Sequence, residues 1–105
     1  MLPVLLTFAA SMSAVGLAAA EAPRDLLQHY ECSRCHADTG IKRGPSYVDI
    51  AARYAGKRQA ATKVAAFIRK GDPGGGRWHI QPHPEVSAVD AEKMAQYILA
   101  HKKKG

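Results

Sequence analysis

Charged side chains are absent from the first 20 residues, which read MLPVLLTFAASMSAVGLAAA. A positively charged start is absent too, because no Lys or Arg follows Met1. The run nevertheless ends in three alanines before Glu21, which is typical of a signal-peptidase site. The alternative is an uncleaved membrane anchor, since about 19 apolar residues just span a bilayer. We expect residues 1–20 to be a signal peptide and residues 21–105 to be one exported domain in the periplasm.

Cysteine and methionine are also scarce, and no β-strand pattern is present. The two cysteines lie only three positions apart, and the exported domain holds one methionine, Met94. No internal repeat and no alternation of apolar and polar residues appears, so the sequence predicts an all-α fold. A domain of about 85 residues buries little surface and often needs a staple to be stable. A large covalent cofactor would supply the missing core.

All 15 Lys and Arg and all 9 Asp and Glu lie after residue 20, so the net charge of +6 belongs to the exported domain. A basic surface favours a partner with an acidic docking surface. Nucleic acid is not an expected partner, because the one dense basic run is residues 102–104 at the tail. We expect a monomer that is not inserted in a membrane once the signal is cleaved.

Apolar residues at helical spacing predict four helices, at about residues 24–35, 46–54, 59–70 and 87–102. Ser46 and Ser87 are typical N-caps, and Gly71 is a natural C-terminal stop. Residues 72–86 hold three of the six prolines and three of the nine glycines, so no regular element fits there. A long loop in so small a domain is usually functional.

The motif that carries chemistry is Cys32-Ser33-Arg34-Cys35-His36. C-x-x-C-H attaches c-type haem: two thiols bond the vinyl groups, and the adjacent His is the proximal iron ligand. A redox dithiol would follow a strand, and none is predicted. A zinc site needs four ligands, for which only other histidines are available. The motif therefore predicts one covalent haem c on Cys32 and Cys35, with His36 on the iron.

The exported domain resembles class I cytochromes c of the small bacterial c551 and c552 kind. The resemblance implies the class I cytochrome c fold, with four to five short helices around one covalent haem. It also implies that the Pro45 carbonyl accepts a hydrogen bond from the proximal His, and that Trp78 packs beside the haem. Tyr47 and Met94 would support the pocket. The matching stretches, in chain order, are residues 32–36, 44–47, 50–54, 75–78, 86–87 and 97–99.

The chain departs from that family pattern at the position of the distal ligand. The family has approximately W-G-x-x-P-M-P, whose Met binds the iron, whereas residues 78–84 read WHIQPHP and place His83 at that position. Imidazole is a strong iron ligand, so the substitution predicts bis-His ligation by His36 and His83. His79 is the rival distal ligand, and an open iron is a further alternative. Met94 is expected to fill the core rather than to bind iron.

The function that follows is periplasmic electron transfer, and the protein is expected not to be an enzyme. Imidazole donates more electron density than thioether, so the haem is expected to have a low potential. One alternative is a haem subunit of a larger redox enzyme. The other is a haem module that binds a small ligand, which requires the distal His to leave the iron. His29 and His101 are expected to be ordinary surface or core residues.

Overall fold

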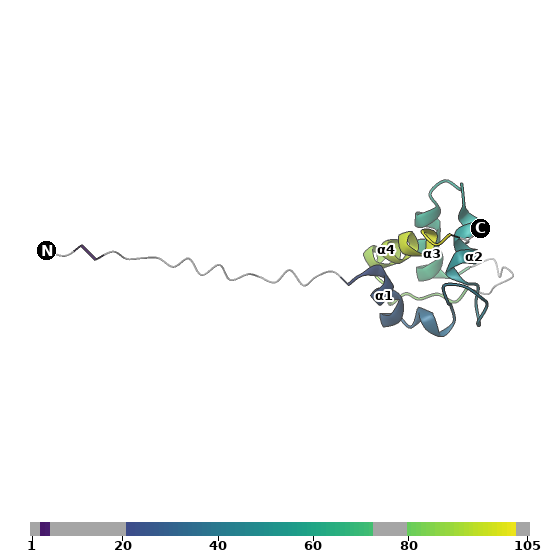
Figure 1. The fold of residues 1–105 in the computed structure, drawn as a ribbon, viewed down its shortest axis with the longest axis horizontal. Helices are drawn as coiled ribbons and strands as arrows, with labels where there is room; N and C mark the ends of the chain where they lie inside the picture. Colours follow the sequence, from purple (N-terminus) through teal and green to yellow (C-terminus); the bar gives the residue numbers. More distant parts are fainter. Residues whose placement is uncertain (1–2, 5–20, 73–79, 103–105) are drawn as a thin grey trace.

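The computed structural model describes residues 3–4, 21–72 and 80–102. Within these ranges the chain forms α-helices and one short 3-10 helix but no strand, so the all-α prediction is confirmed (Figure 1). No helix among the described residues is long and apolar enough to cross a membrane. The predicted signal peptide lies almost wholly outside the described residues. The elements are α1 (Pro23–His29), η1 (Cys32–Arg34), α2 (Tyr47–Tyr54), α3 (Ala60–Lys70) and α4 (Ala88–Leu99).

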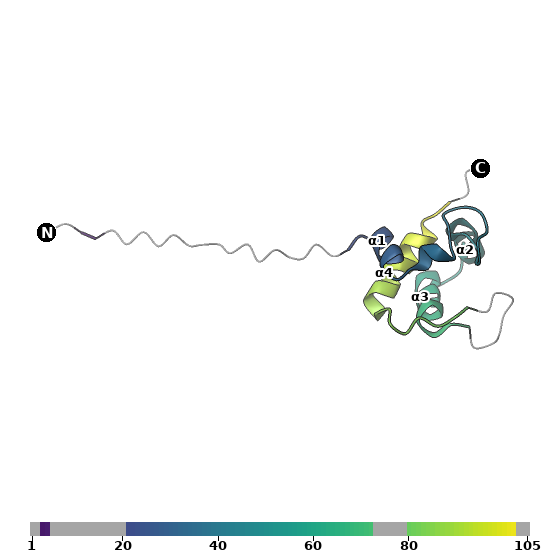
Figure 2. The same cartoon turned by 90° about the horizontal axis from the view of Figure 1, so that it is seen from below.

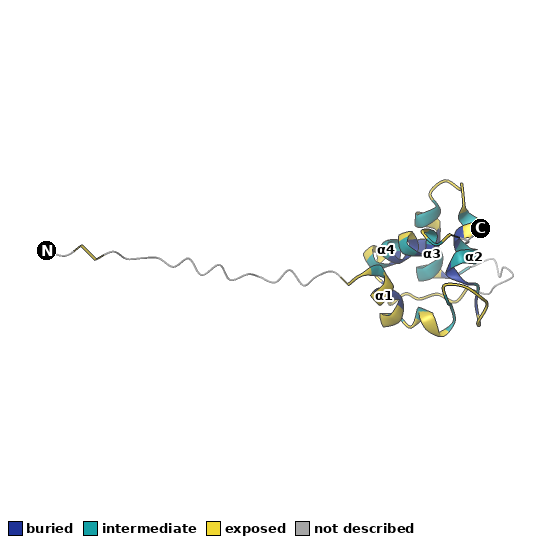
Figure 3. Ribbon diagram, in the orientation of Figure 1, coloured by how far each residue is buried: buried dark blue, intermediate teal, exposed yellow. Residues whose placement is uncertain are grey.

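Helix α4 is the centre of the fold, and α1, α2 and α3 all pack against it. Figures 1 and 2, seen at right angles, both place α1 and α3 beside α4. Figure 3 shows buried residues where these helices face one another and exposed residues on their outer sides. The three most enclosed core residues of α4 are Ala91, Met94 and Ala95. Small residues on either side of one large residue let the neighbouring helices approach closely.

Helices α2 and α4 begin as their sequences predict. Ser46 accepts a hydrogen bond from the Asp49 amide at 3.1 Å, and Ser87 accepts one from the Asp90 amide at 3.1 Å. Each bond satisfies one of the amides that a helix start leaves without a partner. The Asp90 carboxylate also accepts a 2.6 Å hydrogen bond from the Tyr30 hydroxyl, which ties the end of α1 to the start of α4.

The first predicted helix is wrong beyond His29. The sequence pattern predicts one helix to about residue 35, but α1 ends at His29 and Glu31 adopts a left-handed conformation with φ of +64°. A left-handed residue reverses the local turn and cannot continue an α-helix. The cysteines therefore lie on a separate tight turn, η1, and on the residue that follows it.

Helix α4 also ends earlier than predicted, at Leu99 rather than near Lys102. Nδ1 of His101 lies 3.0 Å from the carbonyl oxygen of Tyr97 and 3.1 Å from that of Ile98. The side chain thus binds carbonyls that amides of a longer helix would use. This is a side-chain cap at the carboxyl end, where a helix leaves its last carbonyls unpaired.

Candidate haem site

Residues 32–36 form the turn that carries both cysteines, called here the attachment turn, and it is built around the carbonyl of Cys32. That oxygen accepts hydrogen bonds from the amides of Cys35 at 3.1 Å and His36 at 3.0 Å. The two cysteines are not bonded to each other, and both are half-buried. Burial raises the pKa of the Cys32 thiol, so its neutral form is favoured in this setting. Two free thiols one turn apart, followed at once by a histidine, match the donor set that covalent haem attachment needs.

The imidazole of His36 is held from three sides. Its Nδ1 lies 2.6 Å from the carbonyl oxygen of Pro45, which can only accept, so Nδ1 carries the proton and Nε2 is left to bind a metal. The Tyr47 ring stacks on it, with centroids 6.0 Å apart and planes at 24°. On a further side a Cβ added to Gly44 would lie 2.6 Å from the His36 ring. The Pro45 hydrogen bond that the family resemblance implies is thus present in the structure.

Helix α2 is tied back to the attachment turn by the backbone. The amide of Gly44 donates to the carbonyl of Cys35 at 2.9 Å, and the amide of Tyr47 donates to that of Ala37 at 2.9 Å. These bonds fix the loop between the turn and α2 at both ends. They therefore set the position of Pro45 and Tyr47 relative to His36.

Tyr47 is buried and contacts two histidines. Its ring stacks on that of His36 and is tilted against that of His101, whose centroid lies 5.5 Å away. Its hydroxyl is buried with no hydrogen-bond partner among the described residues. Burial, followed by the charges of Cys32 and Asp38, strongly raises the pKa of Tyr47. The tyrosine is therefore neutral and acts here through its ring.

The segment that carries His83 is pinned along the end of α3. The His83 amide donates to the carbonyl of Ile68 at 2.9 Å, and the amide of Asp72 donates to the carbonyl of Ile80 at 3.1 Å. Gly71 has φ of +70°, and a Cβ there would lie 2.5 Å from the Ile80 oxygen. Only glycine permits this close approach, so residues 80–83 are held by backbone contacts rather than by side-chain packing.

The imidazole of His83 is half exposed, at 47%. Its Nδ1 lies 3.2 Å from Oε1 of Glu85. A carboxylate partner on Nδ1 orients an imidazole and leaves the lone pair of Nε2 available to bind a metal. The charge of Glu85 also adds to the rise in the pKa of Cys32, so this carboxylate lies close enough to act on the attachment cysteine. Glu85 also lines one shallow cleft with Tyr30 and Glu31, so segments about 55 positions apart in the sequence lie side by side.

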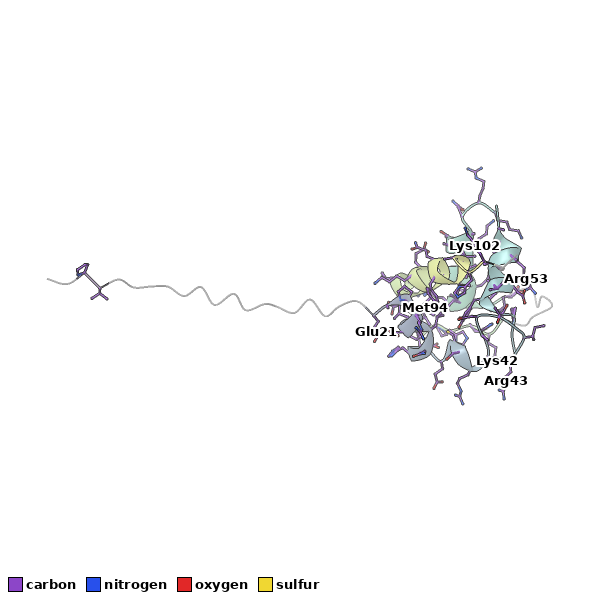
Figure 4. The ribbon with its side chains drawn as sticks, viewed as in Figure 1. Glu21, Lys42, Arg43, Arg53, Met94 and Lys102 are labelled. Atoms are coloured by element: carbon purple, nitrogen blue, oxygen red, sulfur yellow. The ribbon has the colours of Figure 1, made fainter. Side chains whose placement is uncertain are left out.

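The remaining predicted residues have different outcomes. Met94 lies in the core with 0% of its surface exposed. Figure 4 labels its side chain among the helices. Trp78 and the rival ligand His79 lie outside the described residues. The described residues contain no group of three or more His, Cys, Asp or Glu that could hold a metal ion. Sequence reasoning missed the roles of Gly44, Glu85 and His101. Only Gly44, which precedes a proline after the motif, carried a local signal.

The donor set fits a covalent haem. Cys32 and Cys35 supply two unbonded thiols, and His36 supplies an oriented imidazole with Nε2 available. His83 offers a second imidazole that core packing does not enclose.

Known proteins of similar sequence and structure are cytochromes, although no family model matches the chain. The chain is 38% identical to cytochrome c-552 of Hydrogenobacter thermophilus over 94 residues, which cover 87% of this chain and 94% of that protein. It is 40% identical to cytochrome c-552 of Nitrosomonas europaea over 97 residues, covering 91% and 93%. The crystal structure of wild-type Nitrosomonas europaea cytochrome c552 matches with a TM-score of 0.69 at 38% identity, covering 75% of this chain and 99% of that one.

Proposed function

The chain belongs to the class I cytochromes c of the c-551 and c-552 kind, and on that premise we propose that it is a periplasmic electron carrier whose single haem iron is bound by His36 and His83. Like its relatives it binds one covalent haem c, and cytochromes c are electron carriers rather than enzymes. When bound, the haem supplies one-electron chemistry between ferric and ferrous iron. The protein's own residues hold it, orient its ligands and set its potential.

The proximal part of the proposal assigns Cys32 and Cys35 to the haem and Nε2 of His36 to the iron. It is supported by the 2.6 Å contact between His36 Nδ1 and the Pro45 oxygen. That bond fixes the tautomer and the plane of the ring before any ligand binds, and it increases the basicity of Nε2.

The distal part of the proposal assigns Nε2 of His83 to the iron. The observation that carries it is the position of residues 80–86, which run from the end of α3 to the cleft that Glu85 shares with Tyr30 and Glu31, just before the cysteines. His83 stands where the family pattern has Met, its ring is not enclosed by the core, and Glu85 holds its Nδ1. Two imidazoles that each use Nδ1 for a hydrogen bond favour ferric iron more than one imidazole and a thioether do. The expected midpoint potential is therefore lower than in Met-ligated relatives.

Optical and EPR spectra with a redox titration of the matured holoprotein test the ligation. Bis-His ligation predicts a six-coordinate low-spin ferric haem without the far-red charge-transfer band of Met ligation. The variant His83→Met should gain that band and a higher potential, and His83→Ala should bind carbon monoxide readily. His29→Gln, an exposed histidine on α1, is the matched control and should change nothing. A far-red band in the wild type, or an unchanged potential in His83→Met, would contradict the assignment. If His79→Gln binds carbon monoxide readily and His83→Ala does not, His79 is the distal ligand.

We further propose that an acidic partner docks beside the attachment turn. Ile41 is 71% exposed there and is followed by Lys42 and by Arg43, which projects away from the body of the protein (Figure 4). Nζ of Lys42 also donates to the carbonyl of Ser33 at 3.2 Å, which keeps this loop beside the cysteines. An apolar side chain next to two cations suits a weak, fast electron-transfer contact with an acidic surface.

The docking proposal predicts that electron exchange with an acidic redox protein slows as ionic strength rises. Lys42→Glu and Arg43→Glu should slow it further, whereas Lys63→Glu, the same charge change on α3, should slow it less. Equal effects at all three positions would show that net charge, and not this surface, governs the encounter.

Periplasmic location and the monomeric state are tested on the same material. Mass spectrometry of exported protein should give a chain that begins at Glu21 and carries one haem. Sedimentation should give the mass of a monomer. A membrane-bound product that retains residues 1–20 would show an anchor and overturn the proposed cleavage.

A further inference from the structure

His101 lies just beyond α4 in a half-enclosed setting, with 16% of its side chain exposed. Its Nδ1 faces the carbonyl oxygens of Tyr97 and Ile98 at 3.0 and 3.1 Å, and its Nε2 lies 3.5 Å from Oδ1 of Asp38. Its ring meets the edge of the Tyr97 ring with centroids 4.9 Å apart. The sequence predicts an ordinary surface or core histidine here, yet both of its nitrogens lie close to polar groups.

Among the described residues, the groups in contact with this ring are two carbonyl oxygens, one carboxylate and two tyrosine rings. Carbonyl oxygens can only accept, so Nδ1 carries a proton whatever the charge of the ring. A second proton, on Nε2, would face the Asp38 carboxylate. The carboxyl end of α4 adds partial negative charge on the Nδ1 side. Tyr47 faces the ring from α2, and Arg24 of α1 lines the same cleft as Asp38.

Ring contacts join His101 to the proximal ligand through Tyr47. The Tyr47 ring is tilted by 49° against the His101 ring, with centroids 5.5 Å apart, and stacks on the His36 ring, with centroids 6.0 Å apart. Tyr47 is only 5% exposed, so this path runs through a buried ring, which is less polarisable than water. Charges interact more strongly through such a poorly polarisable medium than through water. A charge change at the iron therefore acts on proton binding at His101.

We propose that His101 is a redox-linked proton site, an inference that rests on the proposed proximal ligation by His36. When one electron arrives from a donor protein, His101 takes one proton from solvent at Nε2, and it releases that proton to solvent when the electron leaves. A cleft of about 390 Å³ gives water access to the cluster, and its lining includes Asp38, Tyr47 and Tyr97. His101 is not a ligand and acts on the iron through its charge alone, since it touches neither the cysteines nor His36 in any described contact.

The direction of the effect follows from charge. Reduction removes one positive charge from the iron, so the proton on His101 is held more tightly in the reduced protein. High proton concentration therefore favours reduction, and the midpoint potential falls as pH rises.

Redox titration of the holoprotein at a series of pH values tests the proposal. The wild type should show a potential that falls with pH, and His101→Gln should lose that slope. The control His29→Gln removes an exposed histidine of α1 and should keep it. A slope that persists in His101→Gln, or is absent from the wild type, overturns the proposal.

A second measurement does not depend on how the variant folds. In the wild type, the NMR titration curve of the His101 ring protons should shift to higher pH when the haem is reduced. The curve of the His29 ring protons should not shift. Identical His101 curves in the two redox states overturn the proposal. The low-spin spectrum separates this failure from failure of the proposed function: an intact spectrum with no slope refutes only the role of His101.

Discussion

Replacing Gly44 with alanine tests how tightly the proximal imidazole is held. Gly44 has no left-handed backbone conformation, so alanine there costs no backbone strain. On entropy alone Gly→Ala would stabilise the protein by about 0.4–1 kcal/mol, because the unfolded chain loses freedom. The new methyl group, however, would lie 2.6 Å from Cε1 and 3.0 Å from Nδ1 of His36. The two effects change the free energy of unfolding in opposite directions, so the direction of the measured change shows which is larger.

The clash is expected to win. The His36 ring cannot swing away freely, because Pro45 binds its Nδ1 at 2.6 Å and Tyr47 stacks on it. Overpacking of this kind costs about 1–3 kcal/mol. Taking the middle of both ranges, a cost of about 2 kcal/mol less a gain of about 0.7 kcal/mol leaves a net loss of about 1.3 kcal/mol, which lowers Tm by about 5–10 °C for a domain of this size. The ring must also tilt relative to the haem, so the EPR signature of the ferric iron should change.

Denaturant and thermal unfolding of the holoprotein, together with EPR, measure both effects. The control is Gly56→Ala, since Gly56 has φ of +73° but open space around its Cβ position. That variant should lose about 1 kcal/mol from backbone strain and keep an unchanged EPR spectrum. A Gly44→Ala protein that is as stable as the wild type, with the same spectrum, would refute the argument that this glycine makes room for His36.

Three other perturbations have expected outcomes. Tyr47→Phe should raise the free energy of unfolding by about 1 kcal/mol at neutral pH, since it removes a buried hydroxyl without a described partner; a loss in urea unfolding would mean that the hydroxyl has a partner in the holoprotein. Because burial raises the pKa of Tyr47, the unfolded chain ionises first as pH rises above about 10, and wild-type stability should fall there by up to about 1.4 kcal/mol per pH unit more steeply than that of Tyr47→Phe. Met94→Ala should cost about 2–5 kcal/mol through the cavity it leaves, while the optical spectrum keeps its iron ligation; loss of an iron ligand would show that Met94 is not a core residue alone. Ser87→Ala should cost about 1 kcal/mol in thermal unfolding, and no change would mean that its bond to the Asp90 amide is not stabilising.

The amino-acid sequence determined the local features of this protein. The haem motif is local because covalent attachment and proximal ligation use residues within five consecutive positions. The serine caps and the apolar spacing of α2, α3 and α4 are local too, because a helix start and a helix face depend on neighbours three and four positions away. These signals placed the three helices to within about one turn and predicted the Pro45 bond through the family resemblance.

The spacing of apolar residues did not predict that α1 ends at His29. Leu26, Leu27 and Tyr30 have helical spacing, and the pattern gives no sign that Glu31 turns left-handed. Packing explains the difference, because the Tyr30 hydroxyl binds Asp90 on α4, sixty positions away. That contact fixes the chain direction at the end of α1 before the cysteines are reached.

Only the tertiary structure decided which distant groups share the haem site. It placed Glu85 near Cys32, the backbone of residues 80–83 against the end of α3, and His101 against Tyr47. None of these pairs has a sequence signature, because apolar burial is non-directional and acts on the whole chain at once. The physical reason is the same in each case: α4 buries its small residues against three helices, and that packing brings segments together that are far apart in the sequence.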